Sequence, residues 1–338
     1  MFALVRQSET LHVGTGQAGY ASQAVSKGFN ILYTKVGDVM KMKITRLGRG
    51  GLLGALLALA GSVMALAAAS PALATPEGEF AVFAQCPLSN AELSACLWAK
   101  SESGEFVAGK QKVPITNPIT LQGGFIENEE TGALKFVGAA NGVTISHSPQ
   151  SVPGGLAGLI NCKEIKEILL RISCELVFEN KVTGVNETTE LAAPASSIGL
   201  NEANLLGETG TALSLPVKVH LENPFLGSAC YLGSNSKPIV IEFTTGTTAP
   251  PLPNKPIKGK LGTISVVGGG QILKISNNSL VNNSFAAPGA TGCGGFLVEL
   301  LLDPIINGKL GIPAAAGNNT AILSGTLEQA GANAVREH

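Results

Sequence analysis

The chain has 338 residues and a formal net charge of −1, with few charged residues (14%) and few aromatic ones (5%). After Ala74 it carries 16 Lys and Arg residues against 22 Asp and Glu residues, a net charge of −6. Without a basic stripe, nucleic acid is not an expected partner. The abundance of Gly, Ala, Thr and Ser favours a loop-rich β protein.

A hydrophobic segment near the N-terminus predicts export. Basic residues between Lys41 and Arg49 precede an apolar run over residues 51–69, and the small-residue sequence Ala72-Leu73-Ala74 follows it. This order is typical of a secretory signal peptide with its cleavage site, which we place at residues 40–74. An uncleaved N-terminal anchor is the alternative, because the apolar run is almost long enough to span a bilayer.

Residues 1–39 lie where a signal peptide normally begins, so we interpret them as a non-native extension from a mis-assigned start codon. An internal signal is the alternative. Residues 14–19 fit G-x-G-x-x-G, and Asp38 follows. A dinucleotide site needs a strand before this pattern and a helix and second strand after it. The next element here is the export segment, so no dinucleotide site is predicted.

All six cysteines lie after the predicted signal, and an even number in an exported region indicates disulfides. Sequence alone does not choose the pairing. Proximity along the chain suggests Cys86–Cys96, Cys162–Cys174 and Cys230–Cys293. A metal site is the alternative, but ligand spacings such as C-x₂-C do not occur. Disulfides are therefore the prediction.

Strand patterns dominate the region 75–338. Strict alternation of apolar and polar residues from Leu213 to Glu222 predicts a half-buried strand, and Pro216 places it at a sheet edge or a bulge. Ile239–Phe243 alternates likewise. Other short strands are predicted at Phe80–Gln85, Gln111–Ile115, Leu134–Val137, Val143–Ser146, Leu169–Phe178, Thr188–Ala192, Gly262–Val267, Gln271–Ser276, Phe296–Leu302 and Ala321–Leu327.

Two short helices are also predicted, one over Leu93–Trp98 after a capping box of Ser89 and Glu92 and one over Lys163–Leu170. The proline-rich segment 249–256 predicts a stiff loop. Many short strands separated by turn residues favour an all-β fold. We expect a disulfide-stapled antiparallel β-sandwich, one large or two smaller with a sub-boundary near 150–160, short helical insertions and a frayed tail at 330–338.

Several segments carry a family resemblance. They are Cys86-Pro87-Leu88, residues 153–156, 220–227 together with 230–234, and 244–248. In these segments the chain resembles exported, uncharacterised actinobacterial proteins. The resemblance implies export and a common fold, and it implies no activity.

Residues suited to catalysis are few after residue 74. His220 is predicted to face solvent, and His147 needs a serine and a carboxylate from elsewhere to form a triad. Asp303 is the single aspartate, which argues against calcium loops. Glu127, Glu129 and Glu130 indicate a solvated turn, with weak cation binding as the alternative. Ser234-Asn235-Ser236-Lys237 matches S-x-x-K but lies between Gly233 and Pro238, where a turn is expected.

We therefore predict no catalytic, cofactor-binding or metal-binding residues and no cofactor. The favoured hypothesis is a non-enzymatic secreted or wall-associated protein that is structural, adhesive or ligand-binding, with cell-wall or extracellular components as expected partners. No stable membrane span is expected after signal cleavage. A secreted hydrolase, with a Ser/His pair that includes His147 or with a Glu-based site, is the alternative. A β-barrel pore is a further one, although one Trp and three Tyr supply few residues for aromatic girdles.

Overall fold

The computed structural model describes residues 75–295 and 298–338. The predicted extension (1–39), its Gly-rich motif and the predicted signal peptide (40–74) lie outside the described residues, as do residues 296 and 297. All described residues belong to one compact unit. The sub-boundary expected near residues 150–160 is not seen.

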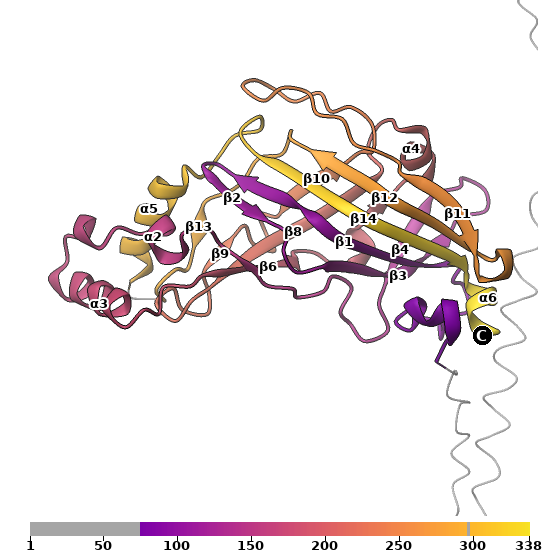
Figure 1. Ribbon diagram of the computed structural model, residues 1–338, viewed down its shortest axis with the longest axis horizontal. Helices are drawn as coiled ribbons and strands as arrows, with labels where there is room; N and C mark the ends of the chain where they lie inside the picture. Colours follow the sequence, from indigo (N-terminus) through magenta and orange to yellow (C-terminus); the bar gives the residue numbers. More distant parts are fainter. Residues whose placement is uncertain (1–74, 296–297) are drawn as a thin grey trace, which may run out of the picture. The chain divides into compact units, whose positions relative to one another are not determined.

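Two antiparallel seven-stranded sheets form the fold, as expected for a β-sandwich, and they are open rather than closed into a barrel (Figure 1). The first sheet has the order β11 (Thr263–Val267), β12 (Ile272–Asn282), β14 (Thr320–Gly331), β1 (Ala95–Ala108), β3 (Ile119–Glu127) and β4 (Leu134–Gly138), with β2 (Gln111–Pro114) paired to β1. The second has the order β13 (Ala290–Thr291), β9 (Tyr231–Leu232), β8 (Leu213–Glu222), β6 (Asn186–Leu191) and β5 (Gln150–Ser151), with β7 (Gly199–Leu200) and β10 (Ile239–Phe243) paired to β8.

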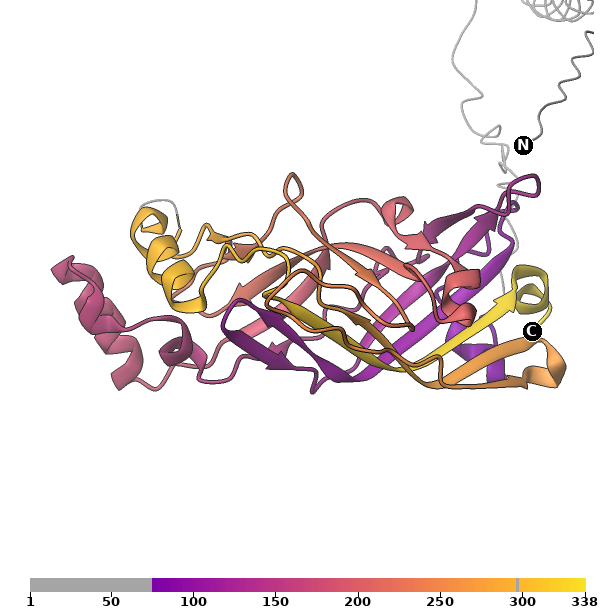
Figure 2. The same cartoon turned by 90° about the horizontal axis from the view of Figure 1, so that it is seen from above.

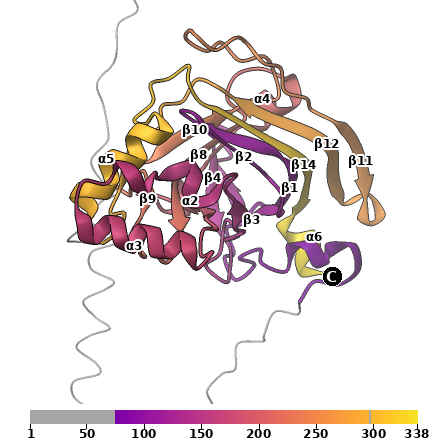
Figure 3. The same cartoon turned by 60° about the vertical axis from the view of Figure 1, so that its left-hand side comes forward.

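Helical segments connect and cover the sheets. They are η1 (Gly78–Phe83), α2 (Gly155–Leu159), η2 (Cys162–Glu164), α3 (Ile168–Glu179), η3 (Ala195–Ser197), α4 (Glu202–Gly207), η4 (Gly268–Gly270), α5 (Glu299–Leu310) and α6 (Ala332–Arg336). Helices α2, α3 and α5 lie together at one end of the sheets, and α6 lies at the other (Figures 1 and 3). Seen from above, the same separation of α3 and α5 from the C-terminus is clear (Figure 2).

The main core fills the space between the sheets, because each sheet turns its apolar face inward. A smaller core lies on the outer face of the first sheet, where Phe80 and Phe83 of η1, Val335 of α6 and the Cys86–Cys96 disulfide pack together. The tail that was expected to fray is thus ordered, since Val335 is only 1% exposed. At this end of β1, the smaller core covers the outer face at Cys96 and the main core covers the inner face at Leu97.

Three disulfides join Cys86 to Cys96, Cys162 to Cys174 and Cys230 to Cys293, which are the pairs that proximity predicts. The first ties the turn that follows η1 to β1, and the second ties η2 to α3. The third encloses the longest loop, with a sequence separation of 63 residues, and both of its cysteines are fully buried. It anchors the segment between β13 and α5 to the second sheet.

The predicted strand over 213–222 is β8, and its alternation places Leu213, Leu215, Val217 and Leu221 in the core. Its position was predicted wrongly, because β8 is a central strand and its pairing with β6 is regular. The Pro216 carbonyl accepts a hydrogen bond from the Ala192 backbone N–H, just beyond the end of β6. The nitrogen of Pro216 points to the same side of β8 as its carbonyl. Because β6 has ended there and β7 has not begun, the missing N–H removes no hydrogen bond between paired strands.

Several local predictions were wrong. Leu93–Trp98 is the start of β1 rather than a helix, since Asn90 forms a local turn by accepting from the Glu92 N–H and the chain then pairs with β3 and β14. The strands predicted at Phe80–Gln85, Leu169–Phe178 and Phe296–Leu302 are instead mainly η1, α3 and α5. Strand β3 was not predicted at all, and Val143–Ser146 forms only an isolated bridge at Ile145.

Candidate functional site

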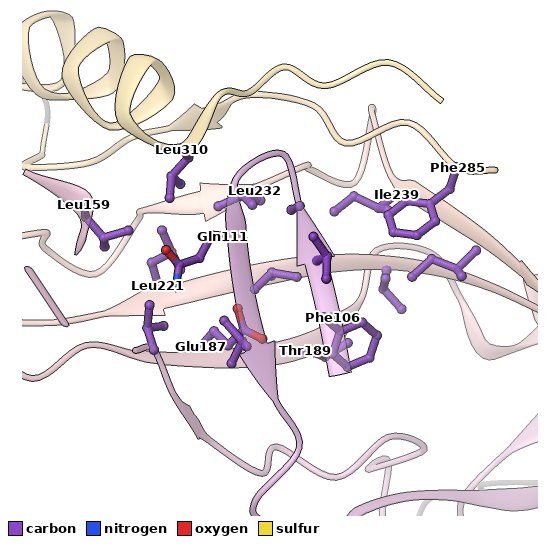
Figure 4. Close-up of a pocket in the computed structure, with 17 residues that line it drawn as sticks. Phe106, Gln111, Leu159, Glu187, Thr189, Leu221, Leu232, Ile239, Phe285 and Leu310 are labelled. Atoms are coloured by element: carbon purple, nitrogen blue, oxygen red, sulfur yellow. The ribbon is translucent and has the colours of Figure 1, made fainter. Parts of the chain in front are cut away.

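An apolar cavity of about 50 Å³ lies between the two sheets. The first sheet contributes side chains of β1 and β2, the second those of β6, β8, β9 and β10, and α2 and α5 close one end through Leu159 and Leu310. Figure 4 shows these side chains gathered from both sheets. A cavity needs only about 10–15 Å³ of this kind of volume to admit one water molecule, so this one has room for a small molecular group.

Glu187 of β6 is, among the described residues, the only ionisable one that lines this cavity. It is buried, and no hydrogen bond or ion pair to its carboxyl group is found in the described part of the chain. Burial without a compensating partner raises the pKa of Glu187 to about 8, because the charged form loses its hydration. Near neutral pH the group is therefore mostly a neutral carboxylic acid, which both donates and accepts a hydrogen bond.

The strand register explains how an acidic residue comes to lie inside. Glu187 pairs with Leu221 and Thr189 pairs with Val219, so both share the inner face of β6. Val185, just before the strand, and Leu191, at its end, have the same parity. In the sequence, the alternation of Val185, Glu187, Thr189 and Leu191 marks the buried face of this strand. Our prediction for the strand did not use that alternation.

Two other polar residues line the cavity. Thr189 lies next to Glu187 on the inner face, as Figure 4 shows. Gln111 of β2 donates from its side-chain amide to the backbone carbonyl of Pro153, at 3.4 Å. No histidine, cysteine or lysine is found among the lining residues, so the described cavity offers an anchor for a polar group and no acid–base pair.

A second apolar cavity, of about 60 Å³, lies beside the first. Both are lined by Phe106, Thr189, Val217 and Ile241, which form the wall between them. Beyond this wall the second cavity is lined by Leu280 and Leu323 of the first sheet and by Leu213, Leu215 and Phe243 of the second. Ser101 and Thr189 are the only polar residues among the described ones that line it.

His220 does not lie free in solvent as predicted but belongs to a polar cluster on the outer face of the second sheet. Its ring stacks on Tyr231, with the ring centroids 4.4 Å apart, and its Nδ1 lies 3.5 Å from a carboxyl oxygen of Glu222. Lys218 lies 3.4 Å from Glu190 and over the Tyr231 ring. Burial and the neighbouring Glu190 raise the pKa of Tyr231. The side chains neighbouring His220 here include no serine or cysteine nucleophile.

The remaining predicted residues lie apart from the cavities. His147 is exposed, and no hydrogen bond from its ring to a serine or carboxylate is found in residues 75–295 and 298–338. Asp303 accepts hydrogen bonds from the backbone N–H groups of Gly292 and Cys293, so it is a structural residue. The residues at 127–130 form an exposed turn around Asn128, and Ser234–Lys237 form a turn closed by reciprocal backbone hydrogen bonds.

Comparison with known proteins finds no family model, no curated protein and no solved structure that matches this chain. The resemblance to exported actinobacterial proteins therefore stays a prediction. Within the described ranges, no group of three or more His, Cys, Asp or Glu residues has the arrangement of a metal site. The same ranges contain no helix with the length and apolarity needed to cross a bilayer.

Proposed function

We propose that the protein is exported and acts, without catalysis, by holding an apolar small molecule between its two sheets. The observation that carries this proposal is Glu187, a buried and unpartnered carboxyl group in a cavity whose other described walls are almost entirely apolar. Leaving such a group without a partner lowers the stability of the fold. A ligand that hydrogen-bonds to Glu187 and fills the cavity would offset that cost.

Export is supported by the three disulfides, because such bonds persist mainly in oxidising compartments. The predicted signal peptide at residues 40–74 points the same way. A binding protein outside the cell would meet apolar molecules of the envelope or medium, which dissolve poorly in water and need a carrier. The proposal thus selects ligand binding from the structural, adhesive and ligand-binding alternatives left open by the sequence.

Xenon tests the cavity directly, because it binds in apolar cavities and makes no hydrogen bonds. We expect xenon under pressure to shift the methyl NMR signals of Leu159 and Leu310, which line this cavity and not the second one. Ala108→Leu, which fills the cavity from β1, is expected to abolish these shifts. The matched change Ala133→Leu, at an exposed position, is expected to leave them unchanged. Methyl signals that do not respond to xenon in the unaltered protein would contradict the proposal.

Export is tested separately in cells that express the full chain. We expect mass spectrometry of the medium and envelope to find a protein that begins at Thr75 and contains no alkylatable thiol, since all six cysteines are paired. An intact chain that stays inside the cell with reactive thiols would rule out export. The xenon experiment would still report on the cavity in that case.

A further inference from the structure

We propose that the protein forms a weak, reversible homodimer in which α3 of one copy packs antiparallel against α3 of a second copy. The contact is made by the apolar stripe of α3, which consists of Ile168, Leu169, Ile172 and Leu176. Three features lead to this assignment: the exposure of the stripe, its self-complementary spacing and the charges beside it. The assignment is independent of the ligand-binding function proposed above.

Helix α3 is apolar on two opposite faces. One face packs on the main core through Leu170, Cys174, Val177 and Phe178. At about 3.6 residues per turn the apolar stripe falls on the opposite face, where Leu169 is 81% and Ile168 is 62% exposed. A helix that is apolar on both sides is expected to be covered on both sides, and a contiguous exposed apolar surface marks an interaction site.

The stripe is accessible and is presented by a preformed helix. Helix α3 lies at one extreme of the described chain, beyond the ends of the sheets (Figure 2). The Cys162–Cys174 disulfide ties it to η2, and Cys174 is buried on the inner face. Because the helix is already fixed in place, little ordering entropy is lost when its outer face binds another surface.

The spacing of the stripe is self-complementary about a two-fold axis. Such an axis brings the same surface of both copies together, so that residue i contacts j and j contacts i. With the axis beside Ile172, the two Ile172 side chains meet at the centre, and Leu169 of each copy lies opposite Leu176 of the other. Residues four apart form ridges by which helices interdigitate, and Ile168, Ile172 and Leu176 form such a ridge.

Charged residues beside the stripe complement each other across the same axis. Arg171 and Glu175 lie on one flank, and neither forms a salt bridge within the part of the chain that the structure describes. The antiparallel arrangement brings Arg171 of each copy to within about 1.5 Å, along the helix axis, of the position opposite Glu175 of the other. A parallel arrangement would instead place this flank against the uncharged one, which carries Ser173 and Asn180.

A bilayer surface suits the stripe less well than a second copy does. Helices that lie on membranes carry Lys and Arg beside their apolar face, and anionic lipids repel acidic residues. Helix α3 contains two glutamates, Glu175 and Glu179, and a single basic residue, Arg171. Alternating charges of both signs fit a protein surface with the same alternation, which the second copy provides.

The size of the stripe predicts a weak dimer. Helix α3 has 12 residues and is therefore about 18 Å long. Stable interfaces bury about 800 Å² on each partner, which is more than one face of such a helix can supply. We therefore expect a Kd of about 10–100 μM.

Sedimentation velocity of the protein purified from cells that express the full chain tests for the dimer. We expect monomer at about 1 μM and mostly dimer at about 500 μM. Ile172→Ser is expected to raise the Kd by about tenfold or more, because it removes the apolar contact at the axis from both copies. Ile264→Ser is the matched control: Ile264 is 48% exposed against 46% for Ile172, and it lies on β11, at the other end of the molecule (Figure 1). The control is expected to retain the dimer.

A mixing experiment tests the antiparallel register. Arg171→Glu and Glu175→Arg are each expected to raise the Kd by about tenfold, since two attractive contacts become two repulsive ones. An equimolar mixture of the two variants is expected to regain the affinity of the unaltered protein, because both contacts in the mixed dimer join a Glu to an Arg. A pairing of these side chains within one helix would not produce this recovery.

Four outcomes would overturn the assignment. They are a protein that stays monomeric over the whole concentration range, a dimer that Ile172→Ser leaves unchanged, and a mixture that associates no better than the separate charge variants. The fourth is monomeric protein that floats with vesicles of phosphatidylcholine and phosphatidylglycerol and loses this binding in Ile172→Ser. That result would assign the stripe to a bilayer instead of a second copy.

Discussion

Replacing Glu187 by glutamine is expected to remove a pH dependence of stability that the unaltered protein shows between about pH 4.5 and pH 8. The pKa of this carboxyl is raised from 4.5 to about 8 by burial in the folded state. In that window the unfolded chain is ionised at Glu187 while the folded chain still holds the proton. Stability therefore falls as the pH rises, by about 1.4 kcal/mol per pH unit from this one group.

Below pH 4.5 both states are protonated, so burying the group then carries no ionisation cost. Above pH 8 the folded state ionises as well, and the loss, at most about 5 kcal/mol, is complete. The free energy of unfolding of the Glu187→Gln variant should show no such decline from this site. As a result, the variant gains stability relative to the unaltered protein as the pH increases.

Urea unfolding at half-unit intervals from pH 4 to pH 9 measures this difference. Glu190→Gln is the matched control, because Glu190 lies on the same strand but faces outward and pairs with Lys218 at 3.4 Å. That control is expected to keep the decline. Parallel curves for Glu187→Gln and the unaltered protein would show that the Glu187 carboxyl is hydrated or paired in solution, and would remove the anchor from the proposed ligand site.

Removal of the Cys230–Cys293 disulfide is expected to destabilise the protein by about 4 kcal/mol. The bond closes a loop with a sequence separation of 63 residues, and a cross-link over a longer loop removes more conformational entropy from the unfolded chain. Both cysteines are fully buried beside the main core, so the bond also holds α5, and with it Leu310 of the cavity wall, near the second sheet.

The double variant Cys230→Ala/Cys293→Ala tests this in guanidinium unfolding, with Cys162→Ala/Cys174→Ala as the matched control. The control loop has a separation of only 12 residues and joins η2 to α3 at the end of the sheets. Loop closure then predicts a smaller loss, of about 3 kcal/mol. A larger loss in the control than in the Cys230/Cys293 variant would show that local packing, and not loop length, sets the contribution of these bonds.

Sequence patterns predicted those parts of the fold that depend on the residues of one short segment and not on contacts with distant segments. The alternation over 213–222 and 239–243 predicted β8 and β10, because a period of two occurs only where one face of a strand is buried. Cysteine spacing suggested the disulfides, since partners close along the chain meet at little entropic cost. The two-sheet class followed from many short strands between turns.

The candidate site was not predicted, for a physical reason. Glutamate is a residue type that normally lies on the surface. Glu187 faces the core because the register of β6 against β8 pairs it with Leu221, on the inner face of the sheet. The cavity walls come from strands far apart along the chain, such as Phe106 on β1 and Ile241 on β10. Whether packing between two sheets leaves a space is decided by side chains of both sheets together.

The amino-acid sequence by itself therefore determined the fold class, the core positions of the most regular strands and the formation of disulfide bonds by the cysteines. Tertiary structure alone decided three things: that the chain from Ala95 onward forms a strand rather than a helix, that residues 168–179 form a helix, and that one carboxyl group is buried without a partner. Local propensity is worth only tenths of a kcal/mol per residue. In β1, pairing with β3 on one side and β14 on the other outweighs the local propensity. For Glu187, burial between the sheets sets the protonation state of the carboxyl group.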